Sequence, residues 1–178
     1  MKKLVQNGYS MIELMVVIFI FIVIFTATMA NFRHGERTEE LRLAADHVAS
    51  VIRQAQSQAL AGIGEETDLS TDYGLLFIEE INQFLIYKDN NKNKIYDIVG
   101  NELIETITLP QTITITEVTG GILNIVFSPP RPTIYINGDT VLQEAEIKLN
   151  HLKISDKQGT INFNRITGRV NSEITSLP

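Results

Sequence analysis

The sequence predicts an α+β fold, in which a long N-terminal helix packs on an antiparallel β-sheet domain. Three observations predict this fold. The run Leu14–Phe32, near the start of the 178-residue chain, contains no charged side chain. An apolar repeat with helical spacing follows it. From Tyr73 onward, short runs rich in β-branched and aromatic residues alternate with turn residues, as in an antiparallel sheet.

The first part of the predicted helix is long and apolar enough to cross a lipid bilayer. Glu13 stands at the start of this run. A carboxylate at such a place is costly unless it is paired, so it is a functional hypothesis by default. Lys2 and Lys3 favour a cytoplasmic N-terminus, whereas two arginines on the other flank oppose this orientation.

The second part of the predicted helix is amphipathic. Apolar residues recur there at alternating spacings of four and three, which places them on one helical face. Gly62 and Gly64 are the predicted stop signals. Small alanines on this face predict a close approach between the helix and the sheet. The face consists of Leu41, Ala45, Val48, Ile52, Ala55 and Ala59.

Eight strands are predicted in the rest of the chain. In Thr112–Thr116 the isoleucines alternate strictly with threonines, which predicts that the isoleucines face a core. The predicted strands are Tyr73–Glu79, Gln83–Lys88, Leu103–Leu109, Thr112–Val118, Ile122–Phe127, Thr133–Ile136, Glu144–Leu149 and Thr160–Asn164.

Four turn signals separate these strands. The pair Asn137-Gly138 predicts a tight hairpin turn, because both residue types tolerate a positive φ. The other predicted turns are Gly120-Gly121, Pro129-Pro130 and the stretch Asp156 to Gly159.

Composition limits the function. The chain has no cysteine, so disulfides and thiol chemistry are excluded. It carries 15 basic and 21 acidic residues, a net charge of −6. Loss of Lys2 and Lys3 would bring this charge near −8, which disfavours broad electrostatic binding to nucleic acid.

The N-terminus resembles that of type IV pilins and type II secretion pseudopilins. The resemblance lies in a basic leader that ends at Gly8, the aromatic Tyr9 after it, Glu13 five residues past the glycine, and the apolar helix that follows. It implies that a prepilin peptidase cuts between Gly8 and Tyr9 and methylates the new amine of Tyr9. It also implies that Glu13 pairs with the N-terminal amine of a neighbouring subunit during filament assembly.

This resemblance divides the chain into four parts: a leader (1–8), a transmembrane and assembly helix (9–32), the amphipathic half of the same helix (33–62) and a β-rich soluble domain (63–178). The implied place is the inner membrane, crossed once, with the β domain on the non-cytoplasmic side, and a filament after assembly. The implied partners are other pilins or pseudopilins, the prepilin peptidase, the assembly platform and the membrane. A secretory signal cut after Thr28-Met29-Ala30, or a plain signal anchor, is the alternative.

The layout and the ending Thr167 to Val170 resemble, more loosely, the GspH/FimT-like minor pilins. DNA-uptake members of that branch carry a Gly-Arg-x-Arg motif. Here Gly168-Arg169 is followed by Val170-Asn171, so the second arginine is missing. Arg165 and Arg169 are therefore candidate DNA contacts, and a DNA-binding minor pilin of a competence system is the alternative function. The acidic composition favours solvated arginines on the last strand instead.

The loop after the second predicted strand is a candidate calcium site. Asp89, Asn91, Asn93 and Asp97 fit the first, third, fifth and ninth places of a calcium loop. Lys94 stands where that loop needs glycine, Gly100 stands where it needs a bidentate glutamate, and Glu102 is a possible substitute. The alternative, which we favour, is an Asn/Asp-rich hairpin turn without a cofactor.

An enzyme is not expected. The three histidines, His34, His47 and His151, are far apart in sequence and form no ligand-spaced motif. The sequence contains no phosphate-binding loop, nucleophile elbow or metal pair. It therefore predicts a structural, membrane-anchored subunit.

Overall fold

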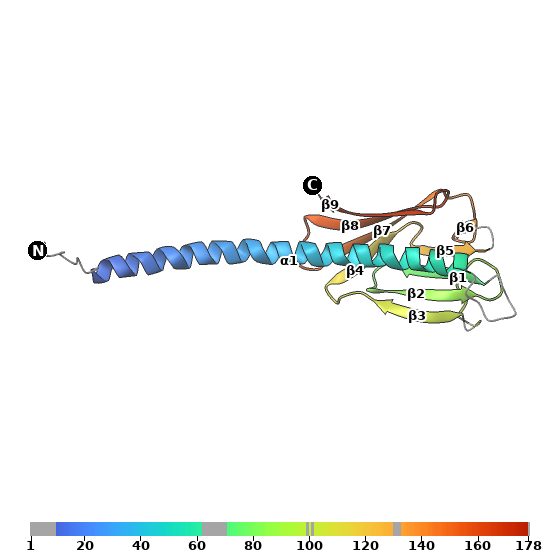
Figure 1. Cartoon of the computed structure of the whole chain (residues 1–178), viewed down its shortest axis with the longest axis horizontal. Coiled ribbons are helices and arrows are strands. Elements are labelled where there is room, and N and C mark those ends of the chain that lie inside the picture. Colours follow the sequence, from blue (N-terminus) through green and yellow to red (C-terminus); the bar gives the residue numbers. More distant parts are fainter. Residues whose placement is uncertain (1–9, 62–70, 99, 101, 130–132, 178) are drawn as a thin grey trace, which may run out of the picture. The chain divides into compact units, whose positions relative to one another are not determined.

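The structure is a computed structural model that describes residues 10–61, 71–98, 100, 102–129 and 133–177, without the side chains of residues 30 and 31. It divides the chain into two compact units, Met1–Glu36 and Arg37–Pro178. The helix α1, Met11–Ala61, starts in the first unit and ends in the second (Figure 1). Each unit is described by itself below.

The helix α1 has 51 residues and contains no proline. Ser10 precedes its first turn, and the N–H of Leu14 donates to the Ser10 carbonyl at 3.3 Å. Gly35 is the one glycine within the helix, and no neighbouring atom comes within 4 Å of a Cβ placed there. The predicted helix is thus confirmed as one continuous element that ends at Ala61, next to the predicted stop.

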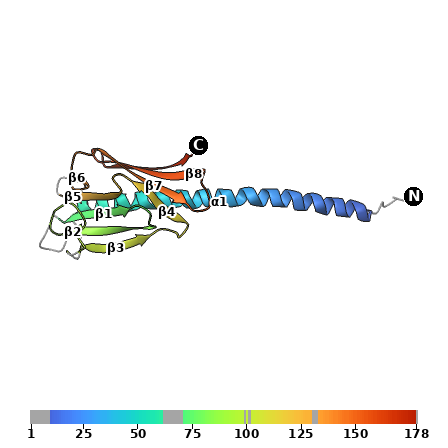
Figure 2. The same ribbon diagram turned by 180° about the vertical axis from the view of Figure 1, so that it is seen from behind.

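In the second unit, α1 buries the face that the sequence predicts. All six predicted residues are at most 3% exposed, whereas Arg42, Asp46 and Ser50 on the other faces are exposed. The helix packs against two antiparallel β-sheets, which confirms the α+β fold (Figures 1 and 2).

Within the described residues, nine strands form the two sheets. The five-stranded sheet has the order β3-β2-β1-β5-β6, and the four-stranded sheet has the order β4-β7-β8-β9. Every pair of neighbours in both sheets is antiparallel. The strands are β1 (Asp72–Ile78), β2 (Gln83–Asp89), β3 (Leu103–Thr108), β4 (Ile113–Val118), β5 (Ile122–Ser128), β6 (Thr133–Ile136), β7 (Glu144–His151), β8 (Lys157–Asn164) and β9 (Arg169–Ser176).

All eight predicted strands are present, but two predictions about the C-terminal part were wrong. The stretch Asp156 to Gly159 is not a turn, because β8 already begins at Lys157 and the chain turns just before it. A ninth strand, β9, was not predicted. Its sequence is mostly polar, because β9 is an edge strand that turns few residues inward, among them the buried Val170.

Contacts with α1 hold β9 in place. Arg53 Nη2 donates to the carbonyl of Val170 at 2.9 Å, and the Ser172 hydroxyl donates to Asp46 Oδ1 at 2.6 Å. These residues are more than a hundred positions apart in sequence. The pattern of apolar and polar residues within β9 therefore does not reveal the contacts with α1 that stabilise this strand.

The core lies between α1 and the inner faces of both sheets. Gly159 on β8 allows the close approach that the small helix residues predict. A Cβ on Gly159 would lie 3.4 Å from both Ala45 Cβ and Leu41 Cδ1. In β4, Ile113 and Ile115 are fully buried, as predicted.

The Asn137-Gly138 turn is also confirmed. Asn137 and Gly138 have φ angles of 51° and 79°, and the flanking Ile136 and Asp139 exchange two backbone hydrogen bonds of 2.9 and 3.1 Å. Gly120 and Gly121 likewise have positive φ angles between β4 and β5. Positive φ is why these turns need glycine or asparagine.

Candidate functional site

The first candidate site is the N-terminal turn of α1, where Ser10 and Glu13 cap the helix. The N–H of Ser10 donates to Glu13 Oε2 at 3.0 Å, and the N–H of Glu13 donates to Ser10 Oγ at 3.3 Å. This reciprocal pair is a capping box, which satisfies two N–H groups at a helix start. The predicted cleavage and methylation sites, Gly8 and Tyr9, lie outside the described residues.

The carboxylate of Glu13 thus has a local partner in the single chain. Sequence reasoning identified Glu13 as a costly charge but missed its bond to Ser10, although a serine three residues before a glutamate is the known signature. Ser10 directly follows Tyr9 in the sequence. The capping box therefore holds the carboxylate at the N-terminal end of α1.

The apolar part of α1 exposes its large side chains all around the helix. In the part of the chain that the structure describes, α1 is the one helix long and apolar enough to cross a membrane, and its most apolar 18-residue segment has a mean hydropathy of 2.7. None of that segment is buried in the fold. The exposed residues include Leu14, Val17, Ile20, Phe21, Ile24 and Phe25.

The two threonines within this apolar segment have satisfied hydroxyl groups. Thr26 Oγ1 donates to the carbonyl of Ile22 at 2.7 Å. Thr28 Oγ1 donates to the carbonyls of Ile24 and Phe25 at 3.0 and 2.9 Å. In lipid, which offers no hydrogen-bond partner, a hydroxyl must bond within the helix. Both threonines therefore suit a helix surrounded by lipid.

The second candidate site is the loop between β2 and β3, which contains the four predicted calcium ligands. Asp89 accepts the N–H groups of Asn93 and Lys94 on its two oxygens, at 3.0 and 2.8 Å. Asn91 Nδ2 and Asn93 Nδ2 both donate to Asp97 Oδ2 at 2.7 Å. The loop thus brings the four residues into one network of its own hydrogen bonds.

Lys94 occupies the space beside Asp89. Its Nζ bonds to Asp72 Oδ2 on β1 and lies 3.7 Å from Asp89 Oδ2. Glu102, the possible substitute ligand, accepts the N–H groups of Asn90 and Asp97 at 3.1 and 2.9 Å. Among the described residues, no group of three or more acidic or histidine side chains could hold a metal ion. The arrangement favours internal hydrogen bonding over calcium.

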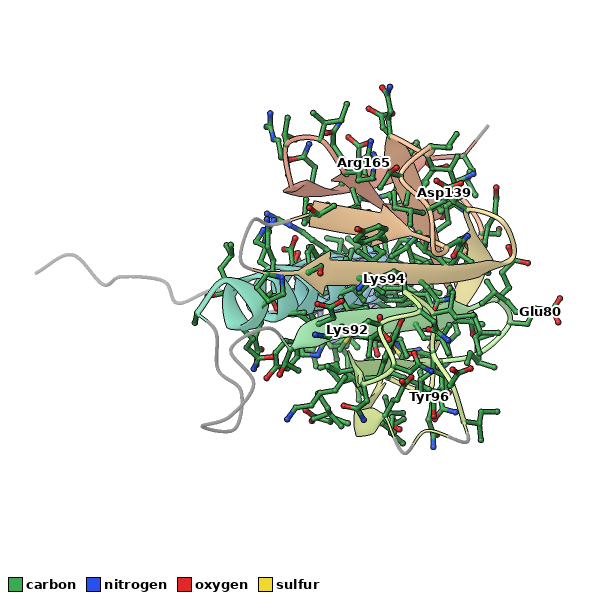
Figure 3. All side chains as sticks on the ribbon, turned by 90° about the vertical axis from the view of Figure 1, so that its right-hand side faces the viewer. Glu80, Lys92, Lys94, Tyr96, Asp139 and Arg165 are labelled. Carbon is green, nitrogen blue, oxygen red and sulfur yellow. The ribbon has the colours of Figure 1, made fainter. Side chains whose placement is uncertain are left out.

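The loop is nevertheless not a simple hairpin tip, which corrects our structural expectation. It folds back over the outer face of the five-stranded sheet (Figure 3). The Tyr96 ring meets the Tyr87 ring edge to face, with centroids 5.2 Å apart. The N–H of Tyr96 and the hydroxyl of Tyr87 both donate to Asn124 Oδ1 on β5, each at 3.2 Å. The loop therefore covers a second, smaller apolar cluster formed by Leu76, Tyr87 and Val126.

The third candidate site is the turn between β8 and β9, where Arg165 lies in the turn and Arg169 begins β9; these are the two predicted DNA contacts. Arg165 Nε donates to the carbonyl of Leu142 at 2.8 Å, and Arg169 Nε donates to Asn171 Oδ1 at 3.0 Å. Both guanidinium groups thus have a partner within the protein. A hollow of about 500 Å³ beside Arg169 is lined mainly by uncharged polar residues and Glu144. This single carboxylate offsets the arginine, so the hollow carries little net positive charge.

The histidines form no common site. His151 is buried, and its Nε2 lies 3.1 Å from Glu40 Oε2 on α1. Its Nδ1 lies 3.0 Å from the backbone N of Lys153, so in the neutral ring Nδ1 accepts this N–H and Nε2 carries the proton. Thr112 Oγ1 donates to the other oxygen of Glu40 at 2.6 Å. His47 lies further along α1, where it lines a small, mainly apolar hollow that Glu40 also borders. Glu40 and His151 are 111 positions apart in sequence, so no local sequence pattern predicted their contact.

Comparison of the chain with protein-family models, with curated proteins and with solved structures gives no match.

Proposed function

We propose that the chain is a minor pilin or pseudopilin, a structural subunit of a type IV pilus or a type II secretion pseudopilus. One observation carries the proposal. A single carboxylate, Glu13, stands five residues after Gly8 and at the first turn of a helix whose next 19 residues are uncharged. The C-terminal half of the same helix packs into a β domain. In a protein that needed only an anchor, this carboxylate would do no more than cap the helix, and it would leave a costly charge at the edge of the lipid.

The proposed mechanism begins with removal of residues 1–8 by a prepilin peptidase at the membrane. The new amine of Tyr9, which the same enzyme would methylate, and the carboxylate of Glu13 then stand at the same end of the helix. In lipid, each charge is costly without a partner. Pairing the carboxylate of one subunit with the amine of the next would compensate both charges and fix the axial register of the filament.

In this proposal, the apolar part of α1 holds the subunit in the inner membrane until it joins the filament. The β domain stands on the non-cytoplasmic side and at the filament surface. The partners are other pilins, the peptidase and the assembly platform. The apolar side chains exposed all around α1 support these roles, because lipid and neighbouring helices can both cover them.

A DNA-binding pilin is the weaker candidate. Arg165 and Arg169 each bond to the protein itself, and the adjacent hollow includes Glu144. The chain is acidic overall. Phosphate binding requires a concentration of positive charge that this surface lacks.

Co-expression with a prepilin peptidase tests the proposed function. The mature protein should begin at Tyr9 and carry one extra methyl group, as measured by intact mass and N-terminal sequencing. Gly8→Val should block the cut, because a bulky side chain keeps the backbone out of the peptidase site. A mature chain that begins after Ala30 would instead identify a secretory signal and refute the proposal.

A further inference from the structure

An amine and a carboxyl group meet beneath the loop that covers the five-stranded sheet. Lys94 comes from this loop (Figure 3). Asp72 lies at the start of β1, and Lys94 Nζ bonds to Asp72 Oδ2. The side chains of Lys94 and Asp72 are only 16% and 2% exposed. The Tyr135 ring lies 5.3 Å from Nζ and covers it from another side. Water therefore has little access to this pair.

A second carboxylate stands beside the pair. Asp89 is fully buried, and its Oδ2 lies 3.7 Å from Lys94 Nζ. Asp72 and Asp89 are directly opposite each other on β1 and β2, so the sheet fixes the separation of their backbones. The N–H groups of Asn93 and Lys94 hold Asp89 in place. Asp89 is thus positioned to take up a proton from the ammonium group and to return it.

A hydrogen-bond donor faces the other oxygen of Asp72. Ser128 Oγ on β5 donates to Asp72 Oδ1 at 2.8 Å, on the oxygen that does not contact Lys94. A donor at this place stabilises negative charge that develops on Oδ1 when a nucleophile adds to the carboxyl carbon. Four side chains therefore supply a nucleophile, an electrophile, a proton carrier and an oxyanion donor.

We propose that Lys94 and Asp72 condense into an intramolecular amide bond that ties the loop to β1. The low exposure of both side chains keeps the two groups in direct contact and protects an amide formed between them from hydrolysis. Fixed contact between the two groups removes the entropy cost of bringing them together. The inference does not depend on the proposed function.

The reaction is balanced without a cofactor. One proton moves from the Lys94 ammonium group through Asp89 to Oδ2 of Asp72. The free amine then attacks Cγ of Asp72, and Oδ1 takes the negative charge beside Ser128. The nitrogen loses a second proton through Asp89 to Oδ2, the Cγ–Oδ2 bond breaks, and Oδ2 leaves as water. An ammonium and a carboxylate thus become one amide and one water molecule.

Peptide mass spectrometry of the denatured full chain tests this inference. Trypsin should fail to cut after Lys94 but still cut after Lys92. A branched peptide should join the Asp72 segment to the Lys94 segment and be lighter than their sum by one water. Because the measurement is made on these peptides, processing at Gly8 or methylation at Tyr9 does not affect it. Complete cleavage after Lys94, with no branched peptide, would overturn the inference whatever the variants show.

Three variants separate the chemistry from the fold. Asp89→Asn keeps the size of the side chain but cannot take up the proton, so the branched peptide should fall at least tenfold. Asp97→Asn removes a carboxylate that does not contact Lys94, so the peptide should form as in the natural sequence. Asp72→Asn should still react, with loss of ammonia in place of water. An Asp89→Asn protein that is fully cross-linked would refute the role of Asp89.

Discussion

The ring of Tyr87 on β2 lies directly over the backbone of Gly74, its partner on β1. A Cβ placed on Gly74 would lie only 2.2 Å from Tyr87 Cζ. The ring has no room to move, because Tyr87 is fully buried and its hydroxyl donates to Asn124 Oδ1 at 3.2 Å. Burial, the largest cause, and the nearby Asp89 carboxylate both raise the pKa of the Tyr87 hydroxyl, so it stays protonated as a donor. Glycine at position 74 is therefore a packing requirement of the outer face.

Gly74→Ala should destabilise the protein by about 1–3 kcal/mol, because the new methyl group overlaps a fixed aromatic ring. The measurement is the free energy of unfolding by denaturant of the full chain in detergent. Gly35→Ala is the matched control, since no atom lies within 4 Å of its new Cβ and alanine favours a helix. Equal unfolding free energies for Gly74→Ala and the natural sequence would contradict the close packing seen here.

Calcium should leave the melting temperature of the protein unchanged. Lys94 fills the space beside Asp89, and the side-chain Nδ2 groups of Asn91 and Asn93 both donate to Asp97. A ligand that binds only the folded state raises the melting temperature. Thermal melts with excess calcium and with a chelator provide the measurement. A calcium-dependent rise that Asp89→Ala abolishes would show that the loop is a metal site.

The contact between Glu40 and the β4–β7 pair should make stability depend on pH in the acid range. The hydrogen bond from Thr112 is the largest cause that lowers the pKa of Glu40 below 4.5, and the bond to His151 and the charges of His151 and Lys153 add to it, whereas desolvation opposes it. A lowered folded-state pKa stabilises the protein above the unfolded-state pKa. This contribution is lost as the pH falls from about 4.5 through the lower folded value.

Glu40→Gln should therefore flatten this part of the stability profile. At neutral pH it should cost up to about 1 kcal/mol, because a charge-assisted hydrogen bond at a partly exposed site becomes a neutral one. Denaturant unfolding of both proteins between neutral and acid pH provides the measurement. Glu39→Gln is the control, since Glu39 is an exposed neighbour whose contact with Arg42 is 3.9 Å long. An unchanged acid profile in Glu40→Gln would exclude this carboxylate as the source.

Glu13→Gln should reduce incorporation into filaments strongly and leave the helix start intact. Glutamine can still bond to the N–H of Ser10 in the capping box, so this variant removes the charge alone. Cleavage after Gly8 should persist, because the cut lies upstream. Pull-down of partner pilins from membrane extracts provides the measurement.

Ser10→Ala is the converse control for Glu13. It removes one bond of the capping box, at a cost of about 1 kcal/mol to the helix start, but it keeps the carboxylate. Assembly should therefore survive in Ser10→Ala and fail in Glu13→Gln. If assembly instead fails in Ser10→Ala and survives in Glu13→Gln, the role of Glu13 is helix capping and not charge pairing. A plain membrane anchor would tolerate both changes.

Predictions from sequence periodicity were confirmed for elements in which the buried residues recur at a regular spacing. The face from Leu41 to Ala59 and the alternation in β4 are both buried as expected, because the helix and the strand each turn the same side to the core at a fixed period. The strand β9 escaped prediction for the converse reason. Few of its residues face the core, so its sequence shows little alternation of apolar and polar side chains. Hydrogen bonds to Arg53 and Asp46 of α1 stabilise the strand.

The candidate sites also divide into features that a local sequence pattern identified and contacts that only the structure revealed. Sequence alone identified Glu13 and the residues of the Asp89 loop, because their signals are local spacings of a few positions. It did not reveal that Lys94 reaches Asp72, that Tyr96 covers Tyr87, or that Glu40 meets His151. The first and last of these contacts join residues 22 and 111 positions apart.

The sequence by itself determined the long helix, its apolar and amphipathic halves, the sheet-rich remainder and the isolated carboxylate at the helix start. These features depend on side-chain order within one element, where the backbone fixes the geometry. Only the tertiary structure decided how the two sheets pack against one face of the helix and what the Asp89 loop covers. Strand pairing brings distant segments together, and no local pattern records which charged side chains then become neighbours. The Lys94, Asp72 and Asp89 cluster exists only because β1 and β2 pair in one register and the loop folds back across them.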